Sequence, residues 1–105
     1  MTIVAYVPNL LDRSRFGRSV TFVDDAAEAT AARPDIVLVD LDRCDPGELG
    51  RWRLDGARVV GFGSHVDEER QRSALDAGWD EVLARSVFFR RLPDLLTTAT
   101  GTDGR

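Results

Sequence analysis

Short apolar runs alternate with longer polar stretches along the chain, at a spacing of about twenty residues. β-branched residues dominate the runs, and turn or cap residues flank them. This alternation is typical of repeated βα units around a parallel sheet. The runs predict five strands, at Thr2–Val7, Ser19–Val23, Asp35–Leu41, Arg58–Phe62 and Glu81–Ala84.

The polar stretches between these runs predict helices. The third and fourth strands are almost continuously apolar, which indicates that helices cover both faces of the sheet. The expected helices are Leu10–Gly17, Asp25–Ala32, Pro46–Arg53, Val66–Ala77 and Phe88–Thr98. The available N-terminal caps are Asp24, Asp45, Ser64 and Ser86. Gly78 is placed to end the fourth helix, and Gly17 makes the first helix short or irregular.

Five βα units with short connections predict an open, doubly wound parallel sheet of strand order 2-1-3-4-5, because right-handed crossovers leave few alternatives. Ligands of such sheets bind at the carboxyl ends of the strands, beside the switch point between the first and third strands. The segments expected at this crevice are 7–9, 40–42, 63–65 and 85–86.

The composition is that of one ordinary globular domain. The chain has 105 residues, of which 43% are apolar and 30% are charged. We expect this domain to span residues 1–98. Residues 99–105 are small, polar and aperiodic, and we expect them to form a disordered tail.

The charged residues narrow the classes of function. The formal net charge is -4, so we expect no nucleic-acid partner. Every basic residue is arginine, which excludes mechanisms that need a lysine, such as Schiff bases and P-loop phosphate binding.

Three features of the sequence lead us to expect a cytoplasmic protein. Cys44 is the single cysteine, so the chain can form no internal disulfide or cysteine zinc cluster. The N-terminus lacks the basic flank and apolar stretch of a signal peptide. No apolar run approaches the roughly 18 residues of a membrane-spanning helix, so we expect no membrane partner.

Two segments resemble the receiver domains of two-component response regulators. The segment 33–41, Arg-Pro-Asp-Ile-Val-Leu-Val-Asp-Leu, is similar to the receiver stretch that ends in the phosphoacceptor aspartate, here Asp40. The segment 76–85, Asp-Ala-Gly-Trp-Asp-Glu-Val-Leu-Ala-Arg, is similar to the run around the receiver's fifth strand. The resemblance covers about residues 24–96 and implies a flavodoxin-like fold.

The residues around Asp40 depart from the receiver pattern. A receiver holds Mg²⁺ with its phosphoacceptor and an acidic pair after the first strand, where this chain has Tyr6-Val7-Pro8-Asn9. We therefore expect no cofactor, and at most weak Mg²⁺ binding with Asn9 and Asp42 as makeshift ligands. Gly63 occupies the place of the receiver's Ser or Thr, with Ser64 one residue late.

Arg85 replaces the receiver's lysine. A guanidinium stays charged and grips a carboxylate with two parallel hydrogen bonds. We therefore hypothesise an Arg85–Asp40 pair in which the cation partly replaces the absent metal and holds the site in one state. His65 is the single histidine, and we expect a local hydrogen-bonding role for it at the crevice.

We expect contacts with a protein partner on the surface formed by the fourth predicted helix, the fifth strand and the fifth helix. Trp79 replaces a small residue of the receiver pattern, and large aromatic residues more often pack than bind. We take Trp79, Phe88, Arg90 and Arg91 as the candidate interface, with packing as the first expectation for the two aromatic residues.

These observations predict a stand-alone, non-enzymatic, receiver-like signalling module. It is expected to act by contact with an unknown protein partner, with a homodimer as one possibility, and not to be phosphorylated. One alternative is a genuine receiver that is phosphorylated on Asp40 with the help of Mg²⁺. Another is a sensor of a small molecule or anion at Gly63, Ser64, His65 and Arg85.

Overall fold

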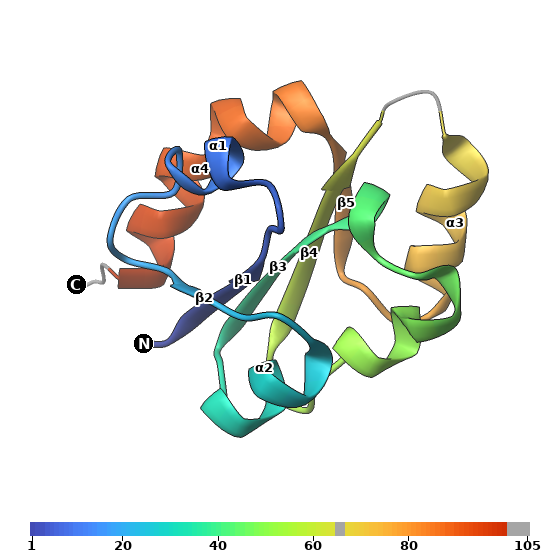
Figure 1. Cartoon of the computed structure of the whole chain (residues 1–105), viewed down its shortest axis with the longest axis horizontal. Coiled ribbons are helices and arrows are strands. Elements are labelled where there is room, and N and C mark those ends of the chain that lie inside the picture. The colour runs from blue at the N-terminus through green and yellow to red at the C-terminus, as the bar shows by residue number, and fades with distance from the viewer. Residues whose placement is uncertain (65–66, 101–105) are drawn as a thin grey trace.

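A five-stranded parallel sheet in the order β2-β1-β3-β4-β5 runs through the molecule (Figure 1). The computed structural model describes residues 1–64 and 67–100, the last four by their backbone alone. The strands are β1 (Ile3–Tyr6), β2 (Thr21–Phe22), β3 (Ile36–Asp40), β4 (Arg58–Gly63) and β5 (Glu81–Ala84). The predicted fold class and strand order are confirmed. β2 is shorter than expected, because this edge strand pairs with β1 at only two positions.

Helical segments cover both faces of the sheet (Figure 1). They are α1 (Leu10–Arg13), α2 (Ala26–Ala32), α3 (Glu68–Asp76) and α4 (Arg85–Thr100), with two 3₁₀ segments, η1 (Leu41–Arg43) and η2 (Pro46–Trp52). α1 and α4 lie on one face, and α2, η2 and α3 lie on the other. Among the described helices, none has the length and apolar character needed to cross a membrane.

The central strand β3 is buried on both faces. Val37 and Val39 pack into the apolar layer under α2, η2 and α3, whereas Leu38 packs into the layer under α4. All three side chains are fully buried. Because alternate side chains of a strand point to opposite faces, an apolar layer on each face requires a continuous apolar run.

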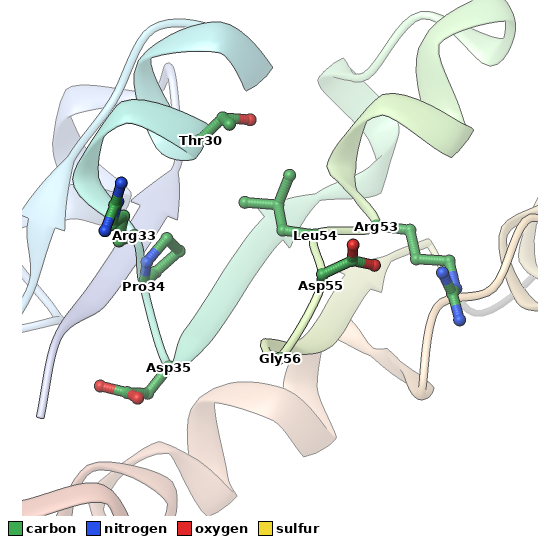
Figure 2. Close-up of a pocket in the computed structure, with 8 residues that line it drawn as sticks. All are labelled: Thr30, Arg33, Pro34, Asp35, Arg53, Leu54, Asp55 and Gly56. Carbon is green, nitrogen blue, oxygen red and sulfur yellow. The ribbon is translucent and has the colours of Figure 1, made fainter.

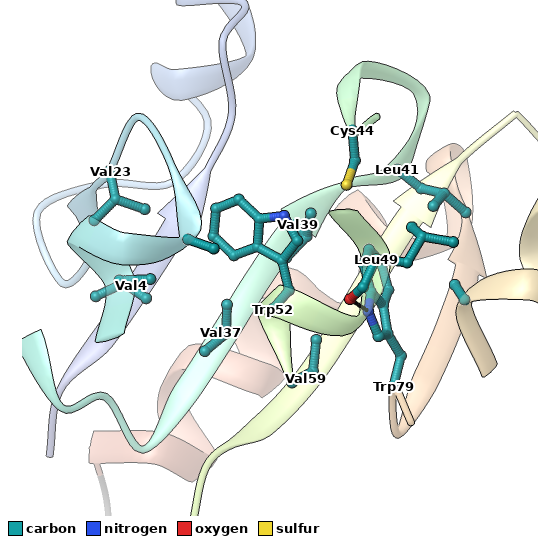
Figure 3. Packing of buried hydrophobic residues seen from close by; sticks show 13 residues of the cluster. Val4, Val23, Val37, Val39, Leu41, Cys44, Leu49, Trp52, Val59 and Trp79 are labelled. Carbon is teal, nitrogen blue, oxygen red and sulfur yellow. Dashed lines mark hydrogen bonds between the residues drawn. The ribbon is translucent and has the colours of Figure 1, made fainter. Parts of the chain in front are cut away.

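Trp79 belongs to the layer that also contains Trp52 (Figure 3). Its indole Nε1 donates a hydrogen bond of 2.8 Å to the carbonyl oxygen of Leu49, and its ring lies against Gly61. The side chain is only 3% exposed. The assignment of Trp79 to an interface is therefore wrong: the indole joins η2 to the sheet.

Phe88 lies in the opposite layer. Its ring stacks on Phe62 with the centroids 4.2 Å apart, and the side chain is fully buried. Phe16 and Phe89 complete this aromatic cluster. Phe88 is therefore also wrong as an interface residue, because the face of α4 that carries it packs on the sheet.

The first helix is short, as expected. Asn9 caps α1 by accepting hydrogen bonds from the backbone N–H groups of Leu11 (2.8 Å) and Asp12 (3.2 Å). α1 ends at Arg13, and Gly17 adopts a positive φ of 75° in the connection to β2. The predicted end of this helix at Gly17 is therefore four residues late.

The predicted helix Pro46–Arg53 forms the 3₁₀ segment η2 instead. Gly47 and Gly50 lie within its seven residues, and glycine disfavours a regular α-helix because it loses the most backbone freedom on ordering. Asp45 caps the segment as predicted, accepting a bond of 2.9 Å from the N–H of Gly47.

Two of the other predicted caps are displaced. Asp25, not Asp24, caps α2, accepting from the N–H of Glu28 at 2.8 Å. Asp67, not Ser64, caps α3, accepting from the N–H of Arg70 at 3.0 Å. In both cases the capping carboxylate stands three residues before the donor, the usual spacing.

The last two predicted helices are only partly correct. α3 begins at Glu68, two residues later than predicted. Gly78 follows α3 with a φ of 104°, as expected of a residue that ends a helix. α4 begins at Arg85, directly after β5, so Ser86 lies inside the helix and does not cap it. α4 continues to Thr100, into the predicted tail. Val66 and residues 101–105 lie outside the described residues.

Gly61 has no room for a side chain, because an added Cβ would overlap the ring of Trp79. We expect Gly61→Ala to lower the free energy of unfolding by about 2 kcal/mol, as overpacked cores do. Urea denaturation followed by tryptophan fluorescence measures the effect. Gly50→Ala is the control, since an added Cβ there meets nothing within 4 Å. Equal stability of the two variants would contradict this packing.

Candidate functional site

Asp40 ends β3 at the carboxyl edge of the sheet. Its side chain is 2% exposed, and its Oδ1 accepts a hydrogen bond of 3.2 Å from the backbone N–H of Asp42. This bond makes Asp40 the N-cap of η1. The carboxylate thus has a structural role at the start of the turn that follows the strand.

The surroundings of Asp40 disfavour its charged form. Burial raises the pKa of the carboxyl above its usual 3.8, and the negative charge of Asp42 raises the pKa further. The positive charge of Arg85 and the hydrogen bond from Asp42 act in the opposite direction. Asp12 adds a smaller effect that raises the pKa. Three carboxylates and one guanidinium therefore share this edge of the sheet.

Asp12 is the site residue that sequence reasoning missed. It lies in α1, is 7% exposed, and forms an ion pair with the guanidinium of Arg85. In the sequence Asp12 is one polar residue among others in a short helix, at no position of the receiver motif. The one available signal was Asn9, because a cap at this position places Asp12 in the first turn of α1.

The guanidinium of Arg85 lies between Asp12 and an aromatic surface. Its Cζ is 5.8 Å from the ring centre of Phe62 and 5.2 Å from that of Phe89, within the range of cation–π attraction. The predicted Arg85–Asp40 pair is wrong, because Asp12 takes the guanidinium. Arg85 acts on Asp40 only through its charge.

The remaining crevice residues are Asn9, Asp42, Gly63 and Ser64. Asn9 caps α1, as described above. Both carboxylate oxygens of Asp42 accept from the backbone N–H of Ser64, at 3.1 and 2.9 Å. Gly63 is buried beside them. His65 lies outside the described residues.

These contacts do not fit a Mg²⁺ ion. Magnesium needs several oxygen ligands in near-ideal octahedral geometry. The oxygen of Asn9 is bonded to α1, Asp12 is paired with Arg85, and Asp42 is bonded to Ser64. Within residues 1–64 and 67–100, no group of three or more His, Cys, Asp or Glu is arranged to hold a metal ion.

A hollow of about 610 Å³ lies at the opposite, amino-terminal edge of the sheet (Figure 2). It is formed between the end of α2 and the loop before β4, with Arg33 and Arg53 at its two ends. The residues that line it are Thr30, Arg33, Pro34, Asp35, Arg53, Leu54, Asp55 and Gly56. None of the predicted crevice residues lines this hollow, so it gives the ligand-sensor alternative no support.

Solved structures of response regulators share this fold. No family model and no curated protein matches the chain. A response regulator from Thermotoga maritima superposes with a TM-score of 0.67 at 16% identity, over 92% of this chain and 98% of that one. The phosphorylated cyanobacterial phytochrome response regulator RcpA gives 0.67 at 20% identity, over 93% and 89%. At these identities the likeness establishes the shared fold and leaves the chemistry open.

A third similar structure is NtrX from Brucella abortus in complex with ADP. It superposes with a TM-score of 0.68 at 21% identity over 94% of this chain. The matched region is only 26% of the NtrX chain. The chain thus corresponds to one domain of that longer protein.

The raised pKa of Asp40 predicts a pH-dependent stability. The folded protein holds this proton more tightly than the unfolded chain, so stability is lost as pH rises from below 3.8 through the raised pKa. Asp40→Asn cannot lose this proton. We therefore expect the variant to gain stability relative to the wild type over that interval, measured by urea denaturation at pH values from 3 to 8.

The control is Asp55→Asn, which changes an exposed carboxyl in the loop before β4. This variant should show no such pH-dependent gain. A constant difference between Asp40→Asn and the wild type across the whole range would contradict the assigned burial of the charge.

Proposed function

We propose that this chain is a receiver-like signalling module of the two-component type that is not phosphorylated and acts by protein contact. The fold and the position of Asp40 at the end of β3 support the receiver class. The ion pair between Arg85 and Asp12 is the observation that carries the proposal of an unphosphorylated state.

The position of Asp40 is unfavourable for accepting a phosphoryl group. The side chain is 2% exposed, so a phosphodonor has little access to its oxygens. The carboxylates of Asp42 and Asp12 add negative charge near a site that would have to hold a phosphoryl dianion.

Arg85 supplies a permanent positive charge at this edge. A bound metal ion neutralises the charge that develops in phosphoryl transfer, and its binding depends on free oxygen ligands. Here the cation belongs to the chain and already pairs with Asp12. Arg85 thus offsets part of the negative charge of this edge in the unmodified protein without a metal ion, which favours one constant state over a switch.

The alternative of a genuine phosphoacceptor has one observation in its favour. Asp12 supplies a carboxylate beside Asp40 after β1, the region where the sequence had suggested an amide alone. For this alternative, Asp12 would have to leave Arg85 to bind Mg²⁺. The two proposals therefore differ in whether Mg²⁺ promotes modification of Asp40.

Intact-mass spectrometry after incubation with acetyl phosphate, with and without Mg²⁺, decides between them. We expect an unchanged mass under both conditions, because Asp40 is buried and the oxygen ligands that Mg²⁺ would need are bonded within the chain. Asp40→Asn is the matched control. A gain of one phosphoryl group that requires both Mg²⁺ and Asp40 would overturn the proposal and make the chain an active receiver.

Action by protein contact is supported by exposed leucines on α1. Leu10 is 74% exposed and Leu11 is 82% exposed, although α1 lies beside α4 (Figure 1). Leucine side chains next to each other at this exposure are more typical of an interaction site than of an ordinary surface. They lie near the carboxyl edge of the sheet that holds Asp40 and Arg85.

The surface around α1 is basic, although the chain as a whole is acidic. Residues 10–18 and 85–96 carry six arginines and two carboxylates, in a chain of net charge -4. Two of these arginines, Arg13 and Arg91, also pair with Asp24 and Glu81 of neighbouring segments. Contacts join the two segments, since Arg15 lies 3.9 Å from the ring centre of Phe89. Arg18 and Arg90 are exposed and have no ion pair within the described part of the chain. An acidic protein surface with an apolar centre fits this face.

Of the predicted interface residues, the two arginines remain. Arg90 belongs to this basic face, and Arg91 is exposed but is paired with Glu81 at 3.2 Å. A second copy of the chain is one candidate for the partner that binds this face.

Photo-crosslinking tests the proposed contact surface. We expect a photoreactive residue at position 11 to crosslink a partner in lysate of the cells that express the chain, and a homodimer would give twice the chain mass. Arg18→Glu with Arg90→Glu should abolish the product, because reversed charges repel an acidic surface. Position 75, where Leu75 is 48% exposed on α3, is the control. Equal products from both positions would contradict this surface.

A further inference from the structure

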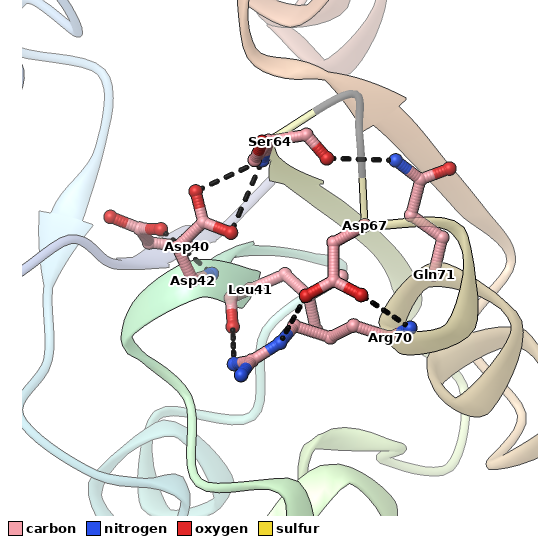
Figure 4. A network of polar contacts seen from close by, with 7 residues as sticks. All are labelled: Asp40, Leu41, Asp42, Ser64, Asp67, Arg70 and Gln71. Carbon is pink, nitrogen blue, oxygen red and sulfur yellow. Dashed lines mark hydrogen bonds and ion pairs between the residues drawn. The ribbon is translucent and has the colours of Figure 1, made fainter.

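Three side-chain contacts connect the turn after β3, Ser64 at the end of β4 and the first turn of α3 (Figure 4). The carboxylate of Asp42 accepts from the backbone N–H of Ser64 at 2.9 Å. Nε2 of Gln71 donates to the backbone carbonyl of Ser64 at 3.1 Å. Nη1 of Arg70 donates to the backbone carbonyl of Leu41 at 3.3 Å. The backbone of Ser64 is thus held on its donor side and on its acceptor side.

Arg70 is itself held in place at the start of α3. Its Nε donates to Oδ2 of Asp67 at 3.1 Å, while Oδ1 of Asp67 accepts from the backbone N–H of Arg70 at 3.0 Å. The first turn of α3 therefore presents Arg70 and Gln71 toward η1 and β4 in a fixed geometry. The helix cap and the contacts to the turn after β3 support one another.

Gly63 makes the contact between Asp42 and Ser64 possible. A Cβ added at position 63 would lie 2.9 Å from Oδ1 of Asp42 and 3.4 Å from Cβ of Leu41. The first distance is shorter than a real Cβ contact, and Asp42 is exposed, so its carboxylate could swing into solvent. Any side chain at position 63 would therefore displace Asp42 from the N–H of Ser64.

We propose that Asp42, Ser64 and Gln71 form an internal clamp, permitted by Gly63, that holds Ser64 at the end of β4 against η1 and α3 without any modification of Asp40. The clamp places a carboxylate of the chain against the backbone N–H at the end of β4, beside Asp40. It thereby fixes Ser64 and keeps a negative charge beside Asp40 that would repel an incoming anion. This inference rests on the proposed function, in which Asp40 stays unmodified.

A double-mutant cycle between Asp42→Ala and Gly63→Ala tests the clamp. Each single variant should lower the urea midpoint by about 0.5 M, since each breaks the same hydrogen bond. The double variant should lose no more than the larger single loss, because the contact can be lost only once. Losses that add up in the double variant would overturn the clamp.

The control cycle pairs Asp42→Ala with Gly50→Ala. Gly50 lies in η2 and has open space for a Cβ, so this pair should be additive. Asp42→Asn provides a second control, because its amide oxygen can still accept from Ser64 while the charge is removed. We expect this variant to keep the coupling with Gly63→Ala.

Amide hydrogen exchange gives a readout that needs no stable Gly63 variant. In Asp42→Ala the amide proton of Ser64 should exchange about tenfold faster, corresponding to about 1.4 kcal/mol. The amide of Gly47, which is capped by Asp45, should exchange as in the wild type. Unchanged exchange at Ser64 would also overturn the clamp.

These results are separable from a failure of the proposed function. Additive losses or unchanged exchange would remove the clamp and leave the question of phosphorylation untouched. Phosphorylation of Asp40 in the wild-type protein would overturn the unmodified state, whatever the outcome of the cycle.

Discussion

The burial of β3 on both faces is the constraint on which the rest of the molecule depends. Val37, Leu38 and Val39 lie between two apolar layers, so the strand has no freedom to shift its register. Asp40 continues this strand and is carried into the same buried environment. The chemistry of the site therefore begins with a carboxylate whose position and low exposure are set by the core.

Buried negative charge at the end of β3 is costly, and the chain offsets part of it with a cation from another element. α4 begins at Arg85 without a connecting loop, which places the guanidinium at the carboxyl edge of β5. α1 supplies Asp12, which pairs with that guanidinium. The guanidinium held in this ion pair lowers the cost of the three carboxylates at this edge, but one cation does not neutralise all of them. Because Arg85 belongs to the chain, its positive charge is present at this edge at any concentration of metal ions.

The fold could be predicted from the sequence to a larger extent than the site. Strand positions follow from apolar runs, which reflect burial on both faces, and the order of the strands follows from the handedness of the crossovers. The 3₁₀ form of η2 was missed, although Gly47 and Gly50 provided a local signal. The pairing of Arg85 with Asp12 could not be predicted, because it joins residues 73 positions apart through the packing of α1 against α4.

The contact between Asp42 and the end of β4 also could not be predicted from the sequence, because it joins residues that are distant along the chain. From sequence, Gly63 stands where a receiver has a hydroxyl and Asp42 is a makeshift Mg²⁺ ligand, and each interpretation treats its residue alone. The structure joins them, because a carboxylate on the turn after β3 reaches the backbone at the end of β4 only if position 63 has no side chain. The missing hydroxyl at position 63 and the carboxylate of Asp42 on the N–H of Ser64 are therefore two parts of one arrangement. A departure from a family pattern at one position is best interpreted together with the residue that fills the space it leaves.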